Sequence, residues 1–180
     1  MRGQRAIWLV GMMGAGKSTV GRELAREVAR PFCDTDEVIS LRAGRSVPEI
    51  FEQDGEPHFR ALEREVIEAA GDDGAVVALG GGAMAQPGMA ERLLARGTVV
   101  YLRARSETLL ERIGDPRSRP LLAGLSERER EARIVALLRE REASYAQAHE
   151  VVDVDALDAQ AVVREIVSAL DARERQDGRG

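Results

Sequence analysis

Short, fully apolar runs alternate along this chain with longer stretches in which apolar residues recur every three or four positions. The short runs have the length of buried strands, and we expect strands at residues 6–10, 75–79, 98–102 and 151–152, with a further brief strand that reaches residues 34–36. The longer stretches predict helices at residues 17–28, 38–42, 48–55, 57–70, 89–95, 106–113, 126–148 and 159–170. Apolar strands separated by helices are typical of a parallel sheet that is covered by helices on both faces. The pattern therefore predicts an α/β fold.

Two segments show no such periodicity. Residues 114–125 carry two prolines and two glycines, and we expect them to form a mobile lid. Residues 174–180 are polar and are expected to be a disordered tail. A chain of 180 residues has the length of one domain, which we place at residues 1–173. Ser106 is expected to cap the helix that it begins.

Composition narrows the functions open to the chain. Hydrophobic residues make up 44% and charged residues 32%, which is typical of a globular protein. Aromatic residues make up only 3% and the net charge is −5, with the basic residues scattered, so we expect no nucleic-acid partner. The single cysteine, Cys33, favours a reducing, cytoplasmic setting. The apolar run at residues 6–10 is too short for a signal peptide or a membrane span, so no membrane association is expected.

Residues 11–18, GMMGAGKS, match the phosphate-binding pattern G-x-x-x-x-G-K-[ST], here called the P-loop, between a predicted strand and a predicted helix. In such a loop backbone N–H groups converge on phosphate oxygens, and the helix N-terminus adds its positive end. Lys17 is the only lysine among 26 basic residues, which indicates a position that needs a compact ammonium group. We expect Lys17 to reach the β- and γ-phosphates and Ser18 to coordinate Mg²⁺.

Two carboxylates, Asp34 and Asp36, end the second predicted strand, at the edge where open α/β sheets bind ligands. One could hold Mg²⁺ through water while the other orients or deprotonates an attacking hydroxyl. The alternative for an isolated D-x-D is a turn with an aspartate helix cap. The neighbouring P-loop favours the functional interpretation.

Arg60 and Glu63 share a helix face beside Phe59. An arginine oriented by a glutamate would suit a small substrate that bears a carboxylate, whereas the alternative is a solvated ion pair. The glycine run at residues 80–82 follows a predicted strand. Three consecutive glycines cost conformational entropy, so close approach to a ligand explains them better than a simple turn.

Taken in order, the segments GMMGAGKSTVGR, DTD, FEQDGEPHFRALE, LGGGA, RPLLAG and ERxxxY resemble the motifs of the shikimate kinases. The resemblance covers about residues 6–155. It implies the P-loop fold of the nucleoside monophosphate kinases, with five parallel strands and a lid. It also implies ATP-dependent phosphorylation of the 3-hydroxyl of shikimate, a step of aromatic amino acid biosynthesis.

The resemblance assigns roles residue by residue. It implies that ATP is bound by Gly14, Ala15, Gly16, Lys17, Ser18, Thr19, Arg112 and Arg119, with Arg112 stacked on adenine. It implies that shikimate is bound by Asp36, Phe51, Phe59, Arg60, Gly80, Gly81, Gly82 and Arg141, with Arg60 and Arg141 on its carboxylate, Asp36 on its hydroxyls and the two phenylalanines along its ring. Lys17, Asp36 and Arg119 are the implied catalytic residues. Ser18 directly and Asp34 through water would hold one Mg²⁺ per subunit.

Two positions depart from the family pattern. Ala78 stands where many members have Ser or Thr, which puts one water-mediated contact to Mg²⁺ in doubt, and residues 153–158 show no adenine-loop pattern. Two other functions stay open: a related kinase of gluconate or of a nucleoside monophosphate, and a regulatory module that binds ATP without turnover. The aspartate pair together with Arg60 argues against the first, and the presence of Lys17, Asp36 and Arg119 argues against the second. We expect a monomer.

Overall fold

The computed structural model describes residues 5–177 and contains a five-stranded sheet in the order β2-β3-β1-β4-β5, in which every pair of neighbouring strands is parallel. The strands are β1 (Ala6–Val10), β2 (Phe32–Asp34), β3 (Val76–Ala78), β4 (Gly97–Arg103) and β5 (Glu150–Asp153). The helices are α1 (Lys17–Glu27), α2 (Thr35–Ala43), α3 (Val47–Ala69), α4 (Met89–Arg96), α5 (Ser106–Arg112), α6 (Glu127–Tyr145) and α7 (Ala159–Asp177). The predicted five-stranded parallel α/β fold is confirmed.

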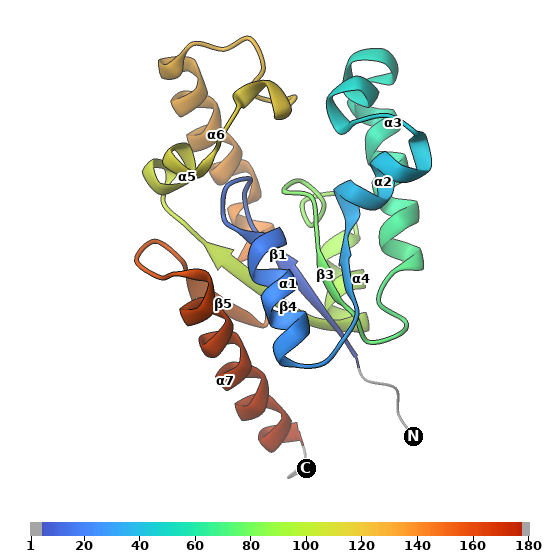
Figure 1. The fold of residues 1–180 in the computed structure, drawn as a ribbon, viewed down its shortest axis with the longest axis vertical. Helices are drawn as coiled ribbons and strands as arrows, with labels where there is room; N and C mark the ends of the chain where they lie inside the picture. Colours follow the sequence, from blue (N-terminus) through green and yellow to red (C-terminus); the bar gives the residue numbers. More distant parts are fainter. Residues whose placement is uncertain (1–4, 178–180) are drawn as a thin grey trace.

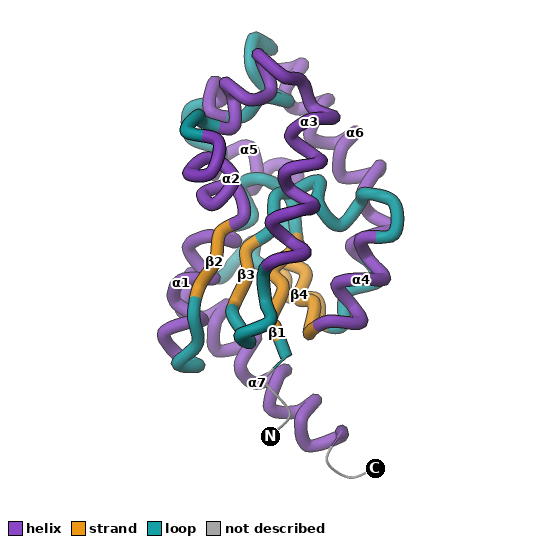
Figure 2. The backbone as a smooth tube through the Cα atoms, turned by 90° about the vertical axis from the view of Figure 1, so that its right-hand side faces the viewer, coloured by secondary structure: helices purple, strands orange, loops and turns teal. Residues whose placement is uncertain are grey.

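Helices cover both faces of the sheet. Figure 1 shows α1 and α7 on one face, and the view in Figure 2 shows α4 and α6 on the other. Every residue of β1 is buried at the centre of this sandwich, with Trp8 fully enclosed. The main core therefore includes the strand that delivers the P-loop.

Two arms rise beyond the carboxyl ends of the strands (Figure 1). One arm is formed by α2 and α3, and the other by α5, the lid and the start of α6. The α2–α3 arm has a small hydrophobic cluster of its own, formed by Ile39, Ile50, Phe59 and Val66. This cluster fixes α3 against α2 independently of the sheet core.

Local sequence explains the shape of α3. Ser46 caps it in a capping box with Glu49, and Pro48 lies in its first turn. At Gly55 the backbone has φ 84° and ψ 166°, values that break the helix, so two helical segments meet there at a kink. The two separate helices expected at residues 48–55 and 57–70 correspond to these segments.

Three local expectations need correction. The second strand ends at Asp34, because Thr35 and Asp36 already belong to the first turn of α2. Ser106 does not cap α5: Arg105 is at the cap position, and its backbone N–H donates to Asp155 Oδ1 at 3.0 Å. The tail expected from residue 174 is helical as far as Asp177, because α7 packs along α1 and its end is rich in helix-forming residues. Residues 178–180 of that tail lie outside the described residues.

The lid contains more regular structure than its sequence indicates. A 3₁₀ turn spans Pro116–Ser118, and the carbonyl of Arg119 accepts hydrogen bonds from the N–H groups of Leu122 and Ala123 at 2.9 and 3.0 Å. Leu122 is buried in the main core. The lid is therefore anchored near its C-terminal end, and its expected mobility stays a prediction.

Candidate active site

The P-loop connects β1 to α1 through glycines in conformations that other residues rarely adopt. Gly14 and Gly16 have φ values of 84° and 91°, and a Cβ on Gly14 would lie 2.9 Å from the Leu109 carbonyl oxygen. Gly16 caps α1 without any side-chain hydrogen bond, so the first N–H groups of the helix are left for another acceptor. This arrangement can receive the oxygens of a phosphate group.

Lys17 is folded back onto this loop. Its Nζ donates to the carbonyl oxygens of Gly11 and Met12 at 2.8 and 2.9 Å. Burial lowers the pKa of Lys17 to about 8, while the nearby Asp36 carboxylate opposes that shift. A buried ammonium with carbonyl oxygens as its partners would gain from the negative charge of a phosphate.

Asp34 caps a helix, as the alternative interpretation of the D-x-D motif expected, and it also contacts the P-loop, while its role at Mg²⁺ stays a prediction. Its Oδ1 accepts the backbone N–H groups of Asp36 and Glu37 at 3.0 and 3.4 Å and so caps α2. Its Oδ2 accepts the Ser18 hydroxyl at 2.5 Å. These neighbouring oxygen ligands suit a hard cation such as Mg²⁺, which takes few protein ligands and keeps water and phosphate oxygens. Within residues 5–177 no cluster of three or more His, Cys, Asp or Glu side chains suited to a metal ion occurs.

Asp36 faces the same space from the first turn of α2. Its Oδ1 is buried and has no hydrogen-bond partner within residues 5–177. Burial raises the pKa of the Asp36 carboxyl, the Asp34 carboxylate raises it further, and the Lys17 ammonium opposes both. An unpartnered buried carboxylate oxygen is a site that a hydroxyl donor would satisfy.

The glycine run brings charged side chains close to the backbone. A Cβ would lie 2.1 Å from Glu63 Oε1 if it were added to Gly80, and 2.4 Å from Arg60 Nη2 if it were added to Gly82. On Gly81 it would lie 3.3 Å from Arg141 Nη1. Each glycine therefore makes room for a different charged side chain, and the expected close approach to a ligand stays a prediction.

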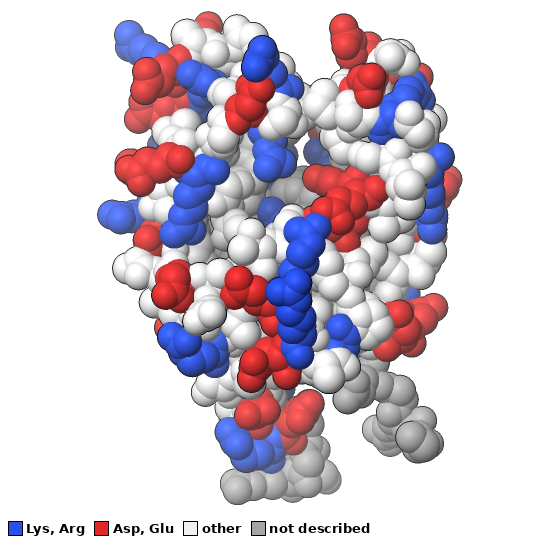
Figure 3. Space-filling model, viewed as in Figure 1, with Lys and Arg blue, Asp and Glu red and all other residues white. Residues whose placement is uncertain are grey.

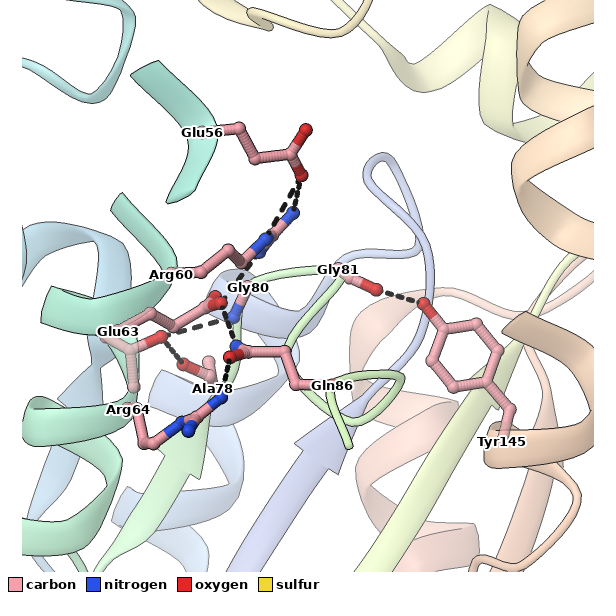
Figure 4. A network of polar contacts seen from close by, with 10 residues as sticks. Glu56, Arg60, Glu63, Arg64, Ala78, Gly80, Gly81, Gln86 and Tyr145 are labelled. Carbon is pink, nitrogen blue, oxygen red and sulfur yellow. Dashed lines mark hydrogen bonds and ion pairs between the residues drawn. The ribbon is translucent and has the colours of Figure 1, made fainter. Parts of the chain in front are cut away.

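Arg60 is held by carboxylates on its own helix. Its Nη1 donates to Glu63 Oε2 at 2.7 Å, and its Nε and Nη2 donate to Glu56 Oε1 at 3.2 and 2.9 Å (Figure 4). Glu63 is fully buried, so this is not the solvated ion pair that was the alternative. Three of the five guanidinium N–H donors are engaged, and two remain for a ligand.

Two cavities adjoin at the ends of the strands, in the hollow between the arms (Figure 3). The phosphate cavity, of about 350 Å³, is lined by the P-loop with Asp34, Asp36, Arg112 and Arg119. The acceptor cavity, of about 190 Å³, is lined by Asp36, Phe51, Phe59, Arg60, Glu63, residues 80–82, residues 118–121 and Arg141, among others. Asp36 and Arg119 line both cavities, so they lie where contents of the two would meet.

Most of the residues singled out from the sequence line these cavities. Phe51 and Phe59 form an apolar wall, with their ring centroids 4.8 Å apart. Arg112 is tied to the loop after β5, because its Nη2 donates to the Val154 carbonyl oxygen at 2.7 Å. Ala15 is the one buried residue of the P-loop segment 14–18 that does not line the phosphate cavity.

Several residues of the site were missed in the sequence. The hydroxyl of Thr35 accepts the Gly80 N–H at 3.1 Å and joins α2 to the glycine run, and Gln86 contacts Glu63. Tyr145, noted only within a motif, donates its hydroxyl to the Gly81 carbonyl oxygen (Figure 4). No local pattern marks these side chains, because their partners are distant in the sequence.

A larger hollow of about 820 Å³ lies between α1 and α7. None of the residues that line the phosphate cavity or the acceptor cavity lines this hollow, so size alone does not locate the site.

Comparison with known proteins agrees with this geometry. The family model described as "Shikimate kinase" matches residues 13–171. A shikimate kinase of Moorella thermoacetica is 47% identical over 168 residues, which cover 92% of this chain and 94% of the relative, and one of Halorhodospira halophila is 48% identical over 166 residues, which cover 91% and 92%. The structure of the Acinetobacter baumannii shikimate kinase in complex with shikimate superposes with a TM-score of 0.87 at 36% identity, covering 94% of each chain. A Sinorhizobium meliloti gluconokinase, at 20% identity and a TM-score of 0.60, shares only the fold. The chain belongs to the shikimate kinase family.

Proposed function

We propose that this chain transfers the γ-phosphoryl group of ATP to the 3-hydroxyl of shikimate and so forms shikimate 3-phosphate. The observation that carries the proposal is the shared position of Asp36 and Arg119, which line both the phosphate cavity and the acceptor cavity. Family membership supports the same reaction, as does the likeness to a relative described in complex with shikimate. The protein is thus a phosphotransferase with an alcohol as its acceptor.

The acceptor cavity has the chemistry that shikimate requires. Arg60 and Arg141 supply guanidinium groups for its carboxylate, and Phe51 and Phe59 supply an apolar wall for its ring. Asp36 Oδ1, which lacks a partner in the part of the chain that the structure describes, accepts a hydrogen bond from a substrate hydroxyl. The glycine run leaves space for these groups to meet the substrate.

The phosphate cavity has the chemistry that ATP requires. The N–H groups of Gly14 and of residues 16–19 surround the phosphates, and Arg112 lies on the adenine side. Ser18 and Asp34 would hold Mg²⁺, which would neutralise part of the negative charge of the phosphates. Thr35 is hydrogen-bonded to both the Ala78 carbonyl and the Gly80 N–H, so a hydroxyl does lie near the position where Ala78 departs from the family pattern.

Transfer needs alignment and charge stabilisation rather than a covalent intermediate with the protein. Asp36 accepts the proton of the 3-hydroxyl as that oxygen bonds to the γ-phosphorus, and the bond between this phosphorus and the bridging oxygen of ADP breaks. Lys17 and Arg119 stabilise the charge on the transferring group. With the lid closed over both substrates, water is excluded and ATP is not hydrolysed.

A coupled assay that detects ADP, run with shikimate, gluconate and nucleoside monophosphates as acceptors, tests the proposal. Turnover that requires shikimate supports it. Turnover with gluconate or a nucleoside monophosphate instead would identify a different kinase, and ATP binding without turnover would identify a regulatory module. Product analysis by ³¹P NMR should locate the phosphate on the 3-hydroxyl.

We also propose that the chain acts as a monomer in the cytoplasm. Both cavities are lined by residues of one chain, so a second copy is not needed to complete the site. No helix within residues 5–177 has the length and apolar character required to cross a membrane. Sedimentation at micromolar concentration should give the mass of one chain.

A further inference from the structure

Gln86 lies in the loop between β3 and α4 and lines neither cavity. Consecutive turns hold its backbone: its N–H donates to the Ala83 carbonyl oxygen at 3.1 Å, and its own carbonyl oxygen accepts the Met89 N–H at 3.0 Å. From this position its side chain reaches α3. The Gln86 side chain therefore contacts the helix that carries Arg60 and Glu63.

The orientation of the Gln86 amide is fixed by the chemistry of its partners. Its Nε2 donates to Glu63 Oε2 at 2.8 Å, and its Oε1 accepts from Arg64 Nη2 at 3.3 Å (Figure 4). A carboxylate only accepts hydrogen bonds and a guanidinium only donates them. Both contacts therefore require the same orientation of the amide.

Glu63 depends on this contact because it has no exposed side-chain surface. Its Oε2 accepts two hydrogen bonds, one from Arg60 Nη1 at 2.7 Å and one from Gln86. Its Oε1 is buried and has no partner among the described residues. Gln86 therefore supplies one of the two hydrogen bonds that fix this carboxylate.

Glu63 in turn competes with Glu56 for Arg60. Glu63 and Arg60 both line the acceptor cavity, whereas Glu56 does not line it and its side chain is 46% exposed. If Glu63 were less firmly held, the Arg60 guanidinium would shift toward Glu56 and away from the cavity. The direction of Arg60 thus depends on the inner carboxylate being kept in place.

We infer that Gln86 is a positioning residue for the carboxylate of the acceptor: by holding Glu63 in place, it keeps Arg60 directed into the acceptor cavity. The inference rests on the proposed function, because it takes Arg60 as a contact of the shikimate carboxylate. It assigns Gln86 no contact with either substrate.

The arrangement has a pH signature. Burial raises the pKa of the Glu63 carboxyl, and the Arg60 guanidinium opposes this shift. The other charged groups that line the same cavity come from three elements: Asp36 from α2, Arg141 from α6 and Arg119 from the lid. Removing the donor at position 86 withdraws a hydrogen bond from the ionised form, so the pKa of Glu63 rises further. The acidic limb of kcat/KM for shikimate should then move to higher pH.

The test compares Gln86→Met, which keeps the length of the side chain but has no N–H, with Arg64→Met as a matched control. The control removes the other partner of Gln86 and leaves its donation to Glu63 intact. For Gln86→Met we expect KM for shikimate to rise about three- to tenfold, with KM for ATP unchanged. This is less than the full effect of a lost hydrogen bond to a charged group, because Gln86 acts on the substrate only through Glu63 and Arg60. The acidic limb should move upward only in this variant, and Arg64→Met should resemble the wild type.

A second change separates positioning from general loss of structure. Glu56→Gln, made in the Gln86→Met background, weakens the competing carboxylate, so it should restore part of the affinity for shikimate. Recovery supports the inference. An unchanged KM and pH profile in Gln86→Met, or equal losses for both substrates without recovery, would overturn it while the wild type still phosphorylates shikimate. A wild type that does not phosphorylate shikimate would instead refute the proposed function, and the inference with it.

Discussion

Replacing Gly82 with alanine should weaken the binding of shikimate much more than it weakens the fold. An added Cβ would lie 2.4 Å from Arg60 Nη2 and 2.8 Å from Arg60 Cζ. The φ of Gly82 is not in the left-handed region, so the alanine backbone is not strained. The clash falls on the end of a flexible side chain, which can shift outward to Glu56. The site therefore changes while the main chain stays in place.

The magnitude follows from what Arg60 does. A hydrogen bond to a charged group contributes about 1.5–3 kcal/mol, and about 1.4 kcal/mol corresponds to a factor of ten, so KM for shikimate should rise about 10- to 150-fold. Glu63 keeps the N–H of Gln86 when Arg60 moves, so we expect the free energy of unfolding to fall by only about 1 kcal/mol, or about 2–4 °C in Tm for a domain of this size.

The assay varies shikimate at saturating ATP and repeats the series with an analogue whose carboxylate is reduced to an alcohol. Gly82→Ala should lose most of the preference for the acid. Gly80→Ala is the contrasting variant, because its Cβ would lie 2.1 Å from Glu63 Oε1. The Glu63 carboxylate is fully buried and cannot move into solvent, so Tm should fall as well. If KM for shikimate in Gly82→Ala stays within twofold of the wild type, the reasoning about Arg60 is wrong.

Other variants test the phosphate side. Lys17→Ala should abolish turnover, and Lys17→Arg should not restore it because a guanidinium does not fit between the loop carbonyls; a near-native kcat in the arginine variant would contradict this. Since burial lowers the pKa of Lys17 to about 8 and bound phosphate favours its charged form, ATP affinity should fall as pH rises through 8, with proton uptake that calorimetry in different buffers detects; binding enthalpies that do not depend on the buffer would count against it. Asp36→Asn should lower kcat by about 10²-fold or more, with ATP binding nearly unchanged by titration calorimetry; a collapse of ATP binding would place Asp36 at the metal instead. Arg119→Ala should lower kcat while each substrate alone still binds, and hydrogen exchange of residues 114–125 should slow only when both ligands are present; equal protection without ligands would argue for a static lid.

Local chemistry explains what could be predicted. The P-loop is a contiguous segment whose glycines determine its path, and the strand that precedes it is apolar on both faces, so the sequence alone indicates both. Arg60 and Glu63 could be joined because residues three apart share a helix face. In each case the residues that form the feature lie within a few positions of one another in the sequence.

The contacts that escaped prediction join distant parts of the chain. Gln86 and Glu63 are 23 residues apart, and Tyr145 and Gly81 are 64 apart. The missing cap at Ser106 has the same origin, because Asp155, from the loop after β5, accepts the N–H of Arg105. Leu122 anchors the lid in the main core, although the prolines and glycines of residues 114–125 predict an irregular segment. Only the folded arrangement of strands and helices brings such pairs together.

The single lysine also makes the active site chemically addressable. Its side-chain amine is the only one in the chain, and a pKa of about 8 leaves a substantial unprotonated, nucleophilic fraction at mildly alkaline pH. An acylating reagent that reaches Lys17 would place its only side-chain amine label in the P-loop, which mass analysis of peptides separates from a label on the α-amino group. Protection from that label would report nucleotide occupancy directly, by mass, without any engineered reporter.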